Sequence, residues 1–99
     1  MAHRVSPRAE ADLDDIWLYV ARESGSIDVA SRLIDSITHR FLLLADFPHA
    51  GRLRDDDFGN GTRSFAVGEY VIVYCVIGSD ISILRVVHGR RDLEDLFNL

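Results

Sequence analysis

The sequence predicts an α+β domain in which a helical hairpin packs on a small, mostly antiparallel sheet. Two patterns lead to this fold class. Residues 7–46 carry apolar side chains at the three- and four-residue intervals of amphipathic helices, whereas residues 62–87 contain three apolar runs of strand length separated by turns. A short strand before the helices and a short C-terminal helix complete the expected order, which is β-α-α-β-β-β followed by that helix. A chain of 99 residues is expected to form one domain, spanning residues 1–99.

The first expected elements are a short strand at residues 2–5 and a helix that begins after Ser6. Ser6 suits the N-cap because its hydroxyl can accept a hydrogen bond from the helix backbone, and Pro7 suits the first helical position, where no hydrogen bond is lost. The apolar residues then form one stripe, which consists of Ala9, Leu13, Ile16, Trp17 and Val20. Gly25 is expected to end this helix.

A second helix is expected to start at Ser26 or Asp28 and to end before Pro48. Its apolar stripe consists of Ala30, Leu33, Ile34, Ile37, Phe41 and Leu44. Because only a few residues separate the two helices, they are expected to form an antiparallel hairpin. Residues 49–60 have the composition of a loop, and the three consecutive aspartates at 55–57 lack the alternating spacing of a calcium-binding loop.

Three strands are expected next, at residues 62–67, 70–77 and 81–87. The dipeptides Gly68-Glu69 and Gly78-Ser79 are suited to the turns between them. The core between the hairpin and the sheet is expected to contain Leu13, Ile16, Trp17, Val20, Leu33, Ile34, Ile37, Phe41, Leu44, Ile72, Tyr74, Ile83 and Val87.

The last two strands are apolar on both faces, except at Ser82 and Arg85. A sheet that buries one face normally alternates apolar and polar residues. Two helices can cover one face, so the other is expected to need the C-terminal segment, a second copy of the chain or another protein. A partner protein is the preferred interpretation.

The C-terminal segment places His88, Gly89, Arg90 and Arg91 directly after the last strand, before a short amphipathic segment that contains Phe97. Two interpretations of the arginines remain open. They pair with Asp92, Glu94 or Asp95 within the chain, or they contact carboxylates of another protein.

Composition excludes several classes of function. The net charge is −5, and all eleven basic residues are arginines. Neither half of the chain is basic, which disfavours generic or sequence-specific nucleic-acid binding. No apolar run approaches the length of a membrane helix, and the N-terminus does not have the pattern of a signal peptide, so a cytoplasmic protein is expected. Cys75 is expected to be a small core residue, and isolated histidines predict no metal or other cofactor.

Four motifs follow one another along the chain: A-x-x-D-L-x-x-I-W-x-Y from Ala9 to Tyr19, F-P-x-x-G-R from Phe47 to Arg52, R-S-F-x-V-G-x-Y-x-I-x-Y from Arg63 to Tyr74, and R-V-V-H-G-R-R-D-L from Arg85 to Leu93. In this order they resemble the ParE branch of the RelE/ParE superfamily of bacterial toxins. The resemblance implies a toxin that inhibits DNA gyrase. It also implies an antitoxin that wraps an extended, partly helical tail around the toxin, in a tight complex of higher order.

Relatives of the RelE type instead cut messenger RNA on the ribosome, and the resemblance leaves this as the alternative. RNA cleavage needs a base, a proton donor and groups that stabilise phosphorane charge. RelE-like nucleases carry an arginine where this chain has Val71, and a tyrosine or histidine where it has Phe97. The comparison favours a non-enzymatic gyrase inhibitor. His88 is the residue that the nuclease alternative would use as acid or base.

Two further alternatives stay open: topoisomerase IV as the target, and a degenerate, non-toxic module that binds the antitoxin. No nucleophile–base pair or glycine-rich phosphate loop predicts a metabolic enzyme. The candidate residues for binding the target or the antitoxin are Arg63, Arg85, His88, Arg90, Arg91 and Phe97.

Overall fold

A computed structural model describes residues 3–54 and 61–89 of the protein. The elements in chain order are β1 (His3–Val5), α1 (Pro7–Ser24), α2 (Ile27–Asp46), β2 (Arg52–Leu53), β3 (Thr62–Val67), β4 (Tyr70–Ile77) and β5 (Asp80–His88). This order confirms the predicted α+β fold, in which two helices pack on a mostly antiparallel sheet. The expected C-terminal helix and the three aspartates at 55–57 lie outside the described residues.

Both helices begin and end for the reasons that the sequence indicates. The Ser6 hydroxyl accepts a hydrogen bond from the Ala9 N–H at 3.0 Å, with Pro7 at the first helical position, and Gly25 ends α1 with a φ of 67°. At the start of α2, the Ser26 hydroxyl accepts from the Val29 N–H at 3.2 Å, which decides between the two predicted caps. Serine side chains thus satisfy backbone donors that a helix N-terminus leaves without intrahelical partners.

The sheet has five strands in the order β1-β5-β4-β3-β2. β1 runs parallel to β5, and the other pairs are antiparallel. β2 was not predicted, because two exposed residues give no hydrophobic pattern. The bounds of β3 and β4 match the prediction, whereas β5 is one residue longer at each end.

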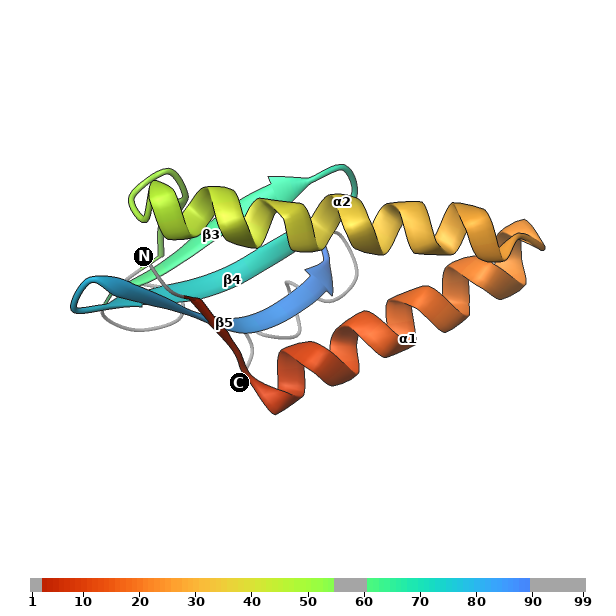
Figure 1. The fold of residues 1–99 in the computed structure, drawn as a ribbon, viewed down its shortest axis with the longest axis horizontal. Coiled ribbons are helices and arrows are strands. Elements are labelled where there is room, and N and C mark those ends of the chain that lie inside the picture. Colours follow the sequence, from red (N-terminus) through yellow and green to blue (C-terminus); the bar gives the residue numbers. More distant parts are fainter. Residues whose placement is uncertain (1–2, 55–60, 90–99) are drawn as a thin grey trace.

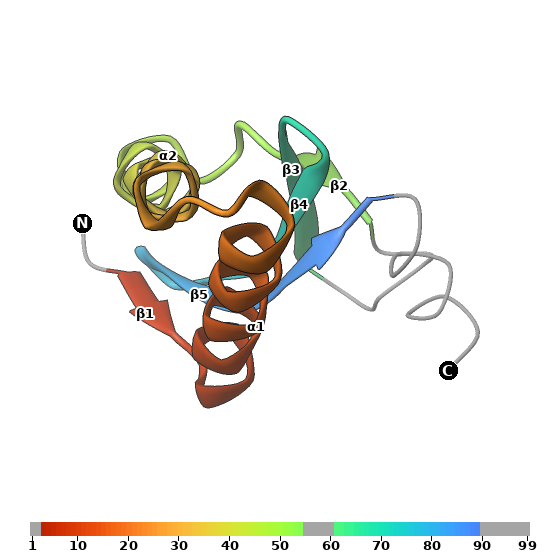
Figure 2. The ribbon, with the colours of Figure 1, turned by 90° about the vertical axis from the view of Figure 1, so that its right-hand side faces the viewer.

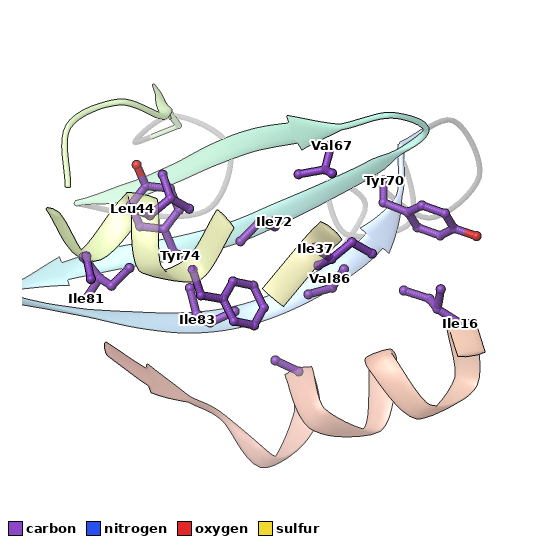
Figure 3. Close-up of a cluster of buried hydrophobic side chains, with 13 residues drawn as sticks. Ile16, Ile37, Leu44, Val67, Tyr70, Ile72, Tyr74, Ile81, Ile83 and Val86 are labelled. Atoms are coloured by element: carbon purple, nitrogen blue, oxygen red, sulfur yellow. The ribbon is translucent and has the colours of Figure 1, made fainter. Parts of the chain in front are cut away.

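Both helices lie on the same side of the sheet, as Figures 1 and 2 show. They meet at the turn around Gly25 and run antiparallel, with α1 beside β5. The core lies between this hairpin and the sheet, and Figure 3 shows its side chains pointing toward one another from β3, β4, β5 and the helices. The largest fully buried core side chains are those of Tyr74, Phe41, Ile37, Leu44, Ile72, Ile81, Ile83 and Val86.

Most of the predicted core is confirmed, and two residues differ from the prediction. Trp17 is half-buried and lies at the contact between the helices, where its Nε1 donates to the Ser31 hydroxyl at 3.2 Å. Val87 is buried, but Val86 is the residue that joins the core with Ile83. A β-bulge explains this spacing: Tyr74 pairs with Ile83 and Val73 pairs with Arg85, so Leu84 is an extra residue that shifts the alternation.

The face of the sheet that points away from the helices is also apolar. Val73 and Val87 are only 3% and 2% exposed, although their neighbours Ile72 and Val86 are the ones that face the hairpin. Ile77 at the end of β4 is 63% exposed. These exposures are those of the chain by itself, so the two valines are buried without a partner protein. Cover by a partner protein stays a prediction.

Candidate functional site

The candidate residues lie at different places in the sheet. Arg63 is on β3, and Arg85 and His88 are on β5. Arg90, Arg91 and Phe97 lie outside the described residues, so the structure does not test their predicted roles. The three described residues do not form one cluster, because each has different neighbours.

Arg85 makes a bidentate ion pair with Asp12 of α1. Its Nε donates to Asp12 Oδ2 at 2.8 Å and its Nη2 donates to Oδ1 at 3.1 Å. The same Oδ2 accepts the backbone N–H of Val86 at 3.0 Å. The Asp12 side chain is 12% exposed, so this carboxylate is held in a fixed position by three charge-assisted hydrogen bonds.

The position of Asp12 has a structural reason. β1 pairs with β5 only as far as Ile83, and beyond it the edge of β5 would present unpaired backbone groups. The Ser6 N–H donates to the Ile83 carbonyl and the Ser6 hydroxyl donates to the Leu84 carbonyl, both at 2.9 Å. The Asp12 carboxylate then accepts a hydrogen bond from the Val86 N–H. The N-terminal part of α1 therefore completes this edge. Arg85 has a structural role here, and its contact with a partner stays a prediction.

Arg63 belongs to a second cluster, which we call the Tyr74 cluster: Pro48, Gly51, Arg63 and Tyr74. The Tyr74 hydroxyl accepts from the Gly51 N–H and donates to the Pro48 carbonyl, both at 2.8 Å. Arg63 Nη1 donates to the Gly51 carbonyl at 2.9 Å. The cluster ties the segment after α2 to β3 and β4, and it was missed in the sequence. A tyrosine in an apolar strand is the signal that could have found it, because a buried hydroxyl needs a partner.

Burial raises the pKa of Tyr74 above its usual value of 10.0. The Gly51 N–H and the positive charge of Arg63 act in the opposite direction and lower this pKa, but their effect is smaller. The hydroxyl is therefore neutral at physiological pH. That is the form that can donate to the Pro48 carbonyl, so Tyr74 is a structural anchor rather than a proton-transfer group.

His88 lies at the end of β5, beside the turn that joins β3 to β4. Its Nε2 is 3.8 Å from a carboxylate oxygen of Glu69, and its ring meets the Tyr70 ring edge-on at a centroid distance of 5.5 Å. A hollow of about 410 Å³ is lined here by His88 together with Gly68, Glu69, Val71 and Gly89. Val71 contributes an apolar side chain to this hollow. The charged group that the structure places near His88 here is the Glu69 carboxylate.

Metal-binding clusters and membrane-spanning helices were sought in the described part of the chain. No group of three metal-binding side chains occurs among residues 3–54 and 61–89. In the same part of the chain, no helix has the length and apolar character needed to cross a bilayer. The basic side chains of Arg63 and Arg85 are engaged with carbonyls and a carboxylate of the chain itself.

Exposed apolar side chains occur near the C-terminal end of α2 and at the residue that follows it. Leu42 is 55% exposed, Leu43 is 36% exposed and Phe47 is 63% exposed. Phe47 is the residue that follows α2, and its N–H donates to the Leu43 carbonyl at 2.9 Å, so these two residues lie about one helical turn apart. Exposed apolar side chains near one another are a common feature of protein–protein contact sites.

The chain is similar to known toxins over most of its length. Residues 4–93 match the family described as "ParE toxin of type II toxin-antitoxin system, parDE". Two relatives come from Caulobacter vibrioides: Toxin ParE3 is 37% identical over 82 residues, which is 83% of this chain and 80% of the relative, and Toxin ParE1 is 35% identical over 86 residues, which is 87% and 86%.

A solved structure supports the same fold. The chromosomal ParDE TA system from P. aeruginosa contains a chain that superposes with a TM-score of 0.76. The match covers 89% of this chain and 95% of that chain, at 23% sequence identity. At this identity the likeness concerns the fold.

Proposed function

This chain belongs to the ParE toxin family of type II toxin–antitoxin systems, and from that premise we propose that it stops growth by inhibiting DNA gyrase through protein binding. A cognate antitoxin neutralises it by forming a tight complex in the cytoplasm. The arrest requires no cofactor and no chemistry by the toxin itself.

The engagement of the two described candidate arginines is the observation that favours this function over RNA cleavage. Arg85 is held by Asp12, and Arg63 Nη1 is held by the Gly51 carbonyl. Neither is directed at a shared site where an RNA phosphate would sit. Val71 adds an apolar side chain at the position where the nuclease relatives place an arginine. The net charge of −5 also suits a protein target better than ribosomal RNA.

Induced expression without antitoxin tests the proposal. We expect filamentation and a DNA-damage response, followed by loss of viability, and we expect the purified protein to inhibit gyrase supercoiling or to trap a cleaved gyrase–DNA complex. Supercoiling assays with gyrase and with topoisomerase IV, run side by side, identify the target. Co-expression with the protein encoded by the adjacent gene should restore growth and yield a stable complex.

The nuclease alternative makes the opposite prediction about timing. Protein synthesis would stop first, and messenger RNA would be cut on ribosomes within minutes. Ribosome-dependent RNA cleavage by the purified chain, with gyrase unaffected, would contradict the proposal. His88 would then be the first residue to replace, because its imidazole lies near the Glu69 carboxylate and could act as an acid or base.

Arg91→Ala is expected to abolish growth inhibition while the melting temperature stays within a few degrees of the wild-type value. The physical reason is that an arginine contact with a protein carboxylate can contribute about 2 kcal/mol or more when it is truncated. The matched control is Arg32→Ala, which removes an exposed arginine from α2. An unfolded Arg91 variant, or one that remains fully toxic, would assign Arg91 to contacts within the chain instead.

A further inference from the structure

The outer side of α2 carries apolar side chains that the fold leaves exposed. Leu43 is 36% exposed, and Phe47, which follows the helix, is 63% exposed. The hydrogen bond from Trp17 to Ser31 marks the side of α2 that faces α1. Leu43 comes twelve residues after Ser31 and therefore points about 120° away from it around the helix. Figure 2 looks along α2 and shows α1 on one side of it, with no other described helix on the opposite side.

Two opposite charges flank Leu43 on the same helix. Arg40 comes three residues before Leu43, and Asp46 comes three residues after it. Since three residues turn an α-helix by about 300° and advance it by about 4.5 Å, the two charges lie about 60° to either side of Leu43, one above it and one below. Within residues 3–54 and 61–89, neither charge forms an ion pair, although Arg40 is half-buried. Six residues apart on one helix, they do not face each other.

This arrangement is complementary to itself. When a second α2 lies antiparallel to the first with the two Leu43 side chains in contact, the residue order is reversed, and Arg40 of each copy comes level with Asp46 of the other. We propose that the chain forms a twofold symmetric dimer through this surface, which we call the α2 patch: Arg40, Leu43, Asp46 and Phe47. The proposal goes beyond the proposed function, because it concerns the chain alone and does not depend on the target.

The dimer combines an apolar contact at its centre with charged contacts at both ends. The two Leu43 side chains remove each other from water on the twofold axis. Arg40 is already half-buried, so contact with the partner copy gives it a counter-charge while removing little further hydration. Phe47 lies about one turn after Leu43 and thus also comes level with Arg40 of the other copy, where its ring can face the guanidinium.

The fold holds one end of the α2 patch in place before a partner arrives. Pro48 follows Phe47, and its carbonyl accepts a hydrogen bond from the Tyr74 hydroxyl at 2.8 Å. A hollow of about 470 Å³ beside this point leaves room for side chains of a second copy; it is lined by Asp46, Phe47, Pro48, His49 and Ala50. Because the Tyr74 cluster fixes the backbone here, association orders little that is not already ordered.

Self-complementarity favours a second copy over a different protein. A different protein would have to carry a carboxylate, a leucine-sized group and a cation of its own at matching levels, whereas the second copy supplies all three by symmetry. Each copy carries a net charge of −5, so the two copies repel each other at long range. The dimer is therefore expected to dissociate on dilution.

Charge reversal in the full-length chain tests the pairing, with sedimentation velocity as the measurement. The mass of the wild type should rise with concentration toward twice that of the monomer. R40E alone and D46R alone should each self-associate about tenfold more weakly, because each brings like charges level with one another. An equimolar mixture of R40E and D46R should dimerise again, since every charge in the mixed dimer meets its opposite.

Exposed residues of α1 provide the matched controls. R22E, D15R and their mixture reverse charges on the other helix and should dimerise within about twofold of the wild type. Leu43→Ser should abolish self-association, whereas Leu18→Ser, which changes a leucine of α1 that is 43% exposed, should not. Thermal melting of each variant checks that it is folded.

The mixture distinguishes pairing between copies from a general effect of charge. A wild-type chain that stays monomeric at every concentration would overturn the inference, and so would a dimer that R40E, D46R and Leu43→Ser leave intact. Two folded, monomeric charge variants that do not associate when mixed would also overturn it. Loss of binding to the protein encoded by the adjacent gene, with self-association unchanged, would assign the α2 patch to that protein instead. None of these results bears on growth arrest or gyrase inhibition, which are measured separately.

Discussion

Asp12→Ala is expected to lower the free energy of unfolding by about 3 kcal/mol, because it leaves a largely buried arginine and a strand N–H without their acceptor. The Asp12 carboxylate accepts two hydrogen bonds from Arg85 and one from the Val86 N–H. The side chains of Arg85 and Asp12 are 24% and 12% exposed, so water can replace the lost acceptor only in part. A loss of this size is a large share of the 5–15 kcal/mol that stabilises a typical domain.

Urea unfolding of purified Asp12→Ala and of Asp14→Ala provides the measurement. Asp14 is an exposed residue of the same helix and serves as the matched control, with an expected effect below about 0.5 kcal/mol. Arg85→Ala should also destabilise the protein, and the double variant should lose less than the sum of the two single losses, because the residues act as a pair. Equal stabilities of the Asp12 and Asp14 variants would show that the ion pair contributes nothing to the fold.

Local signals in the sequence were sufficient for the helices and most of the strands. Ser6, Pro7 and Gly25 define the ends of α1 through backbone hydrogen bonding and conformation, and these effects act within a few residues. The bulge at Leu84 could not be predicted in this way. It depends on how β5 pairs with β4, so the choice between Val86 and Val87 as the core residue is made by tertiary contacts.

The candidate site was predictable to a smaller extent. The sequence identifies the arginines but not their partners. It does not show that Arg85 pairs with Asp12, which is 73 residues away, or that Arg63 donates a hydrogen bond to the Gly51 carbonyl.

The contacts also explain why the four motifs occur together. Asp12 of the first motif binds Arg85 of the last, and the segment from Pro48 to Gly51 binds Tyr74 and Arg63 of the third. The motifs that reveal the family are therefore, in large part, the residues that hold its fold together.

Gly51→Ala is expected to destabilise the protein by about 3 kcal/mol, because a methyl group at this position overpacks a buried site. A Cβ on Gly51 would overlap the Tyr74 hydroxyl, and it would lie 2.7 Å from Tyr74 Cε1 and 2.9 Å from the Ser64 carbonyl oxygen. The carbonyl belongs to β3 and Tyr74 is fully buried, so neither group can move away easily. The requirement for glycine here is one of space, since Gly51 is not among the glycines with positive φ.

Gly89→Ala is the matched control for thermal and urea unfolding. A Cβ on Gly89 would lie 3.3 Å from both the Glu69 carbonyl oxygen and Val71 Cγ2, which a small shift relieves, so we expect a cost below about 1 kcal/mol. Tyr74→Phe alone should cost about 1–3 kcal/mol, because the Gly51 N–H and the Pro48 carbonyl lose their partner. Combined with Gly51→Ala it should cost less than the sum, since the overlap with the hydroxyl disappears. Strict additivity of the two changes, or a Gly51 variant as stable as the Gly89 variant, would show that the Tyr74 cluster does not hold the segment after α2.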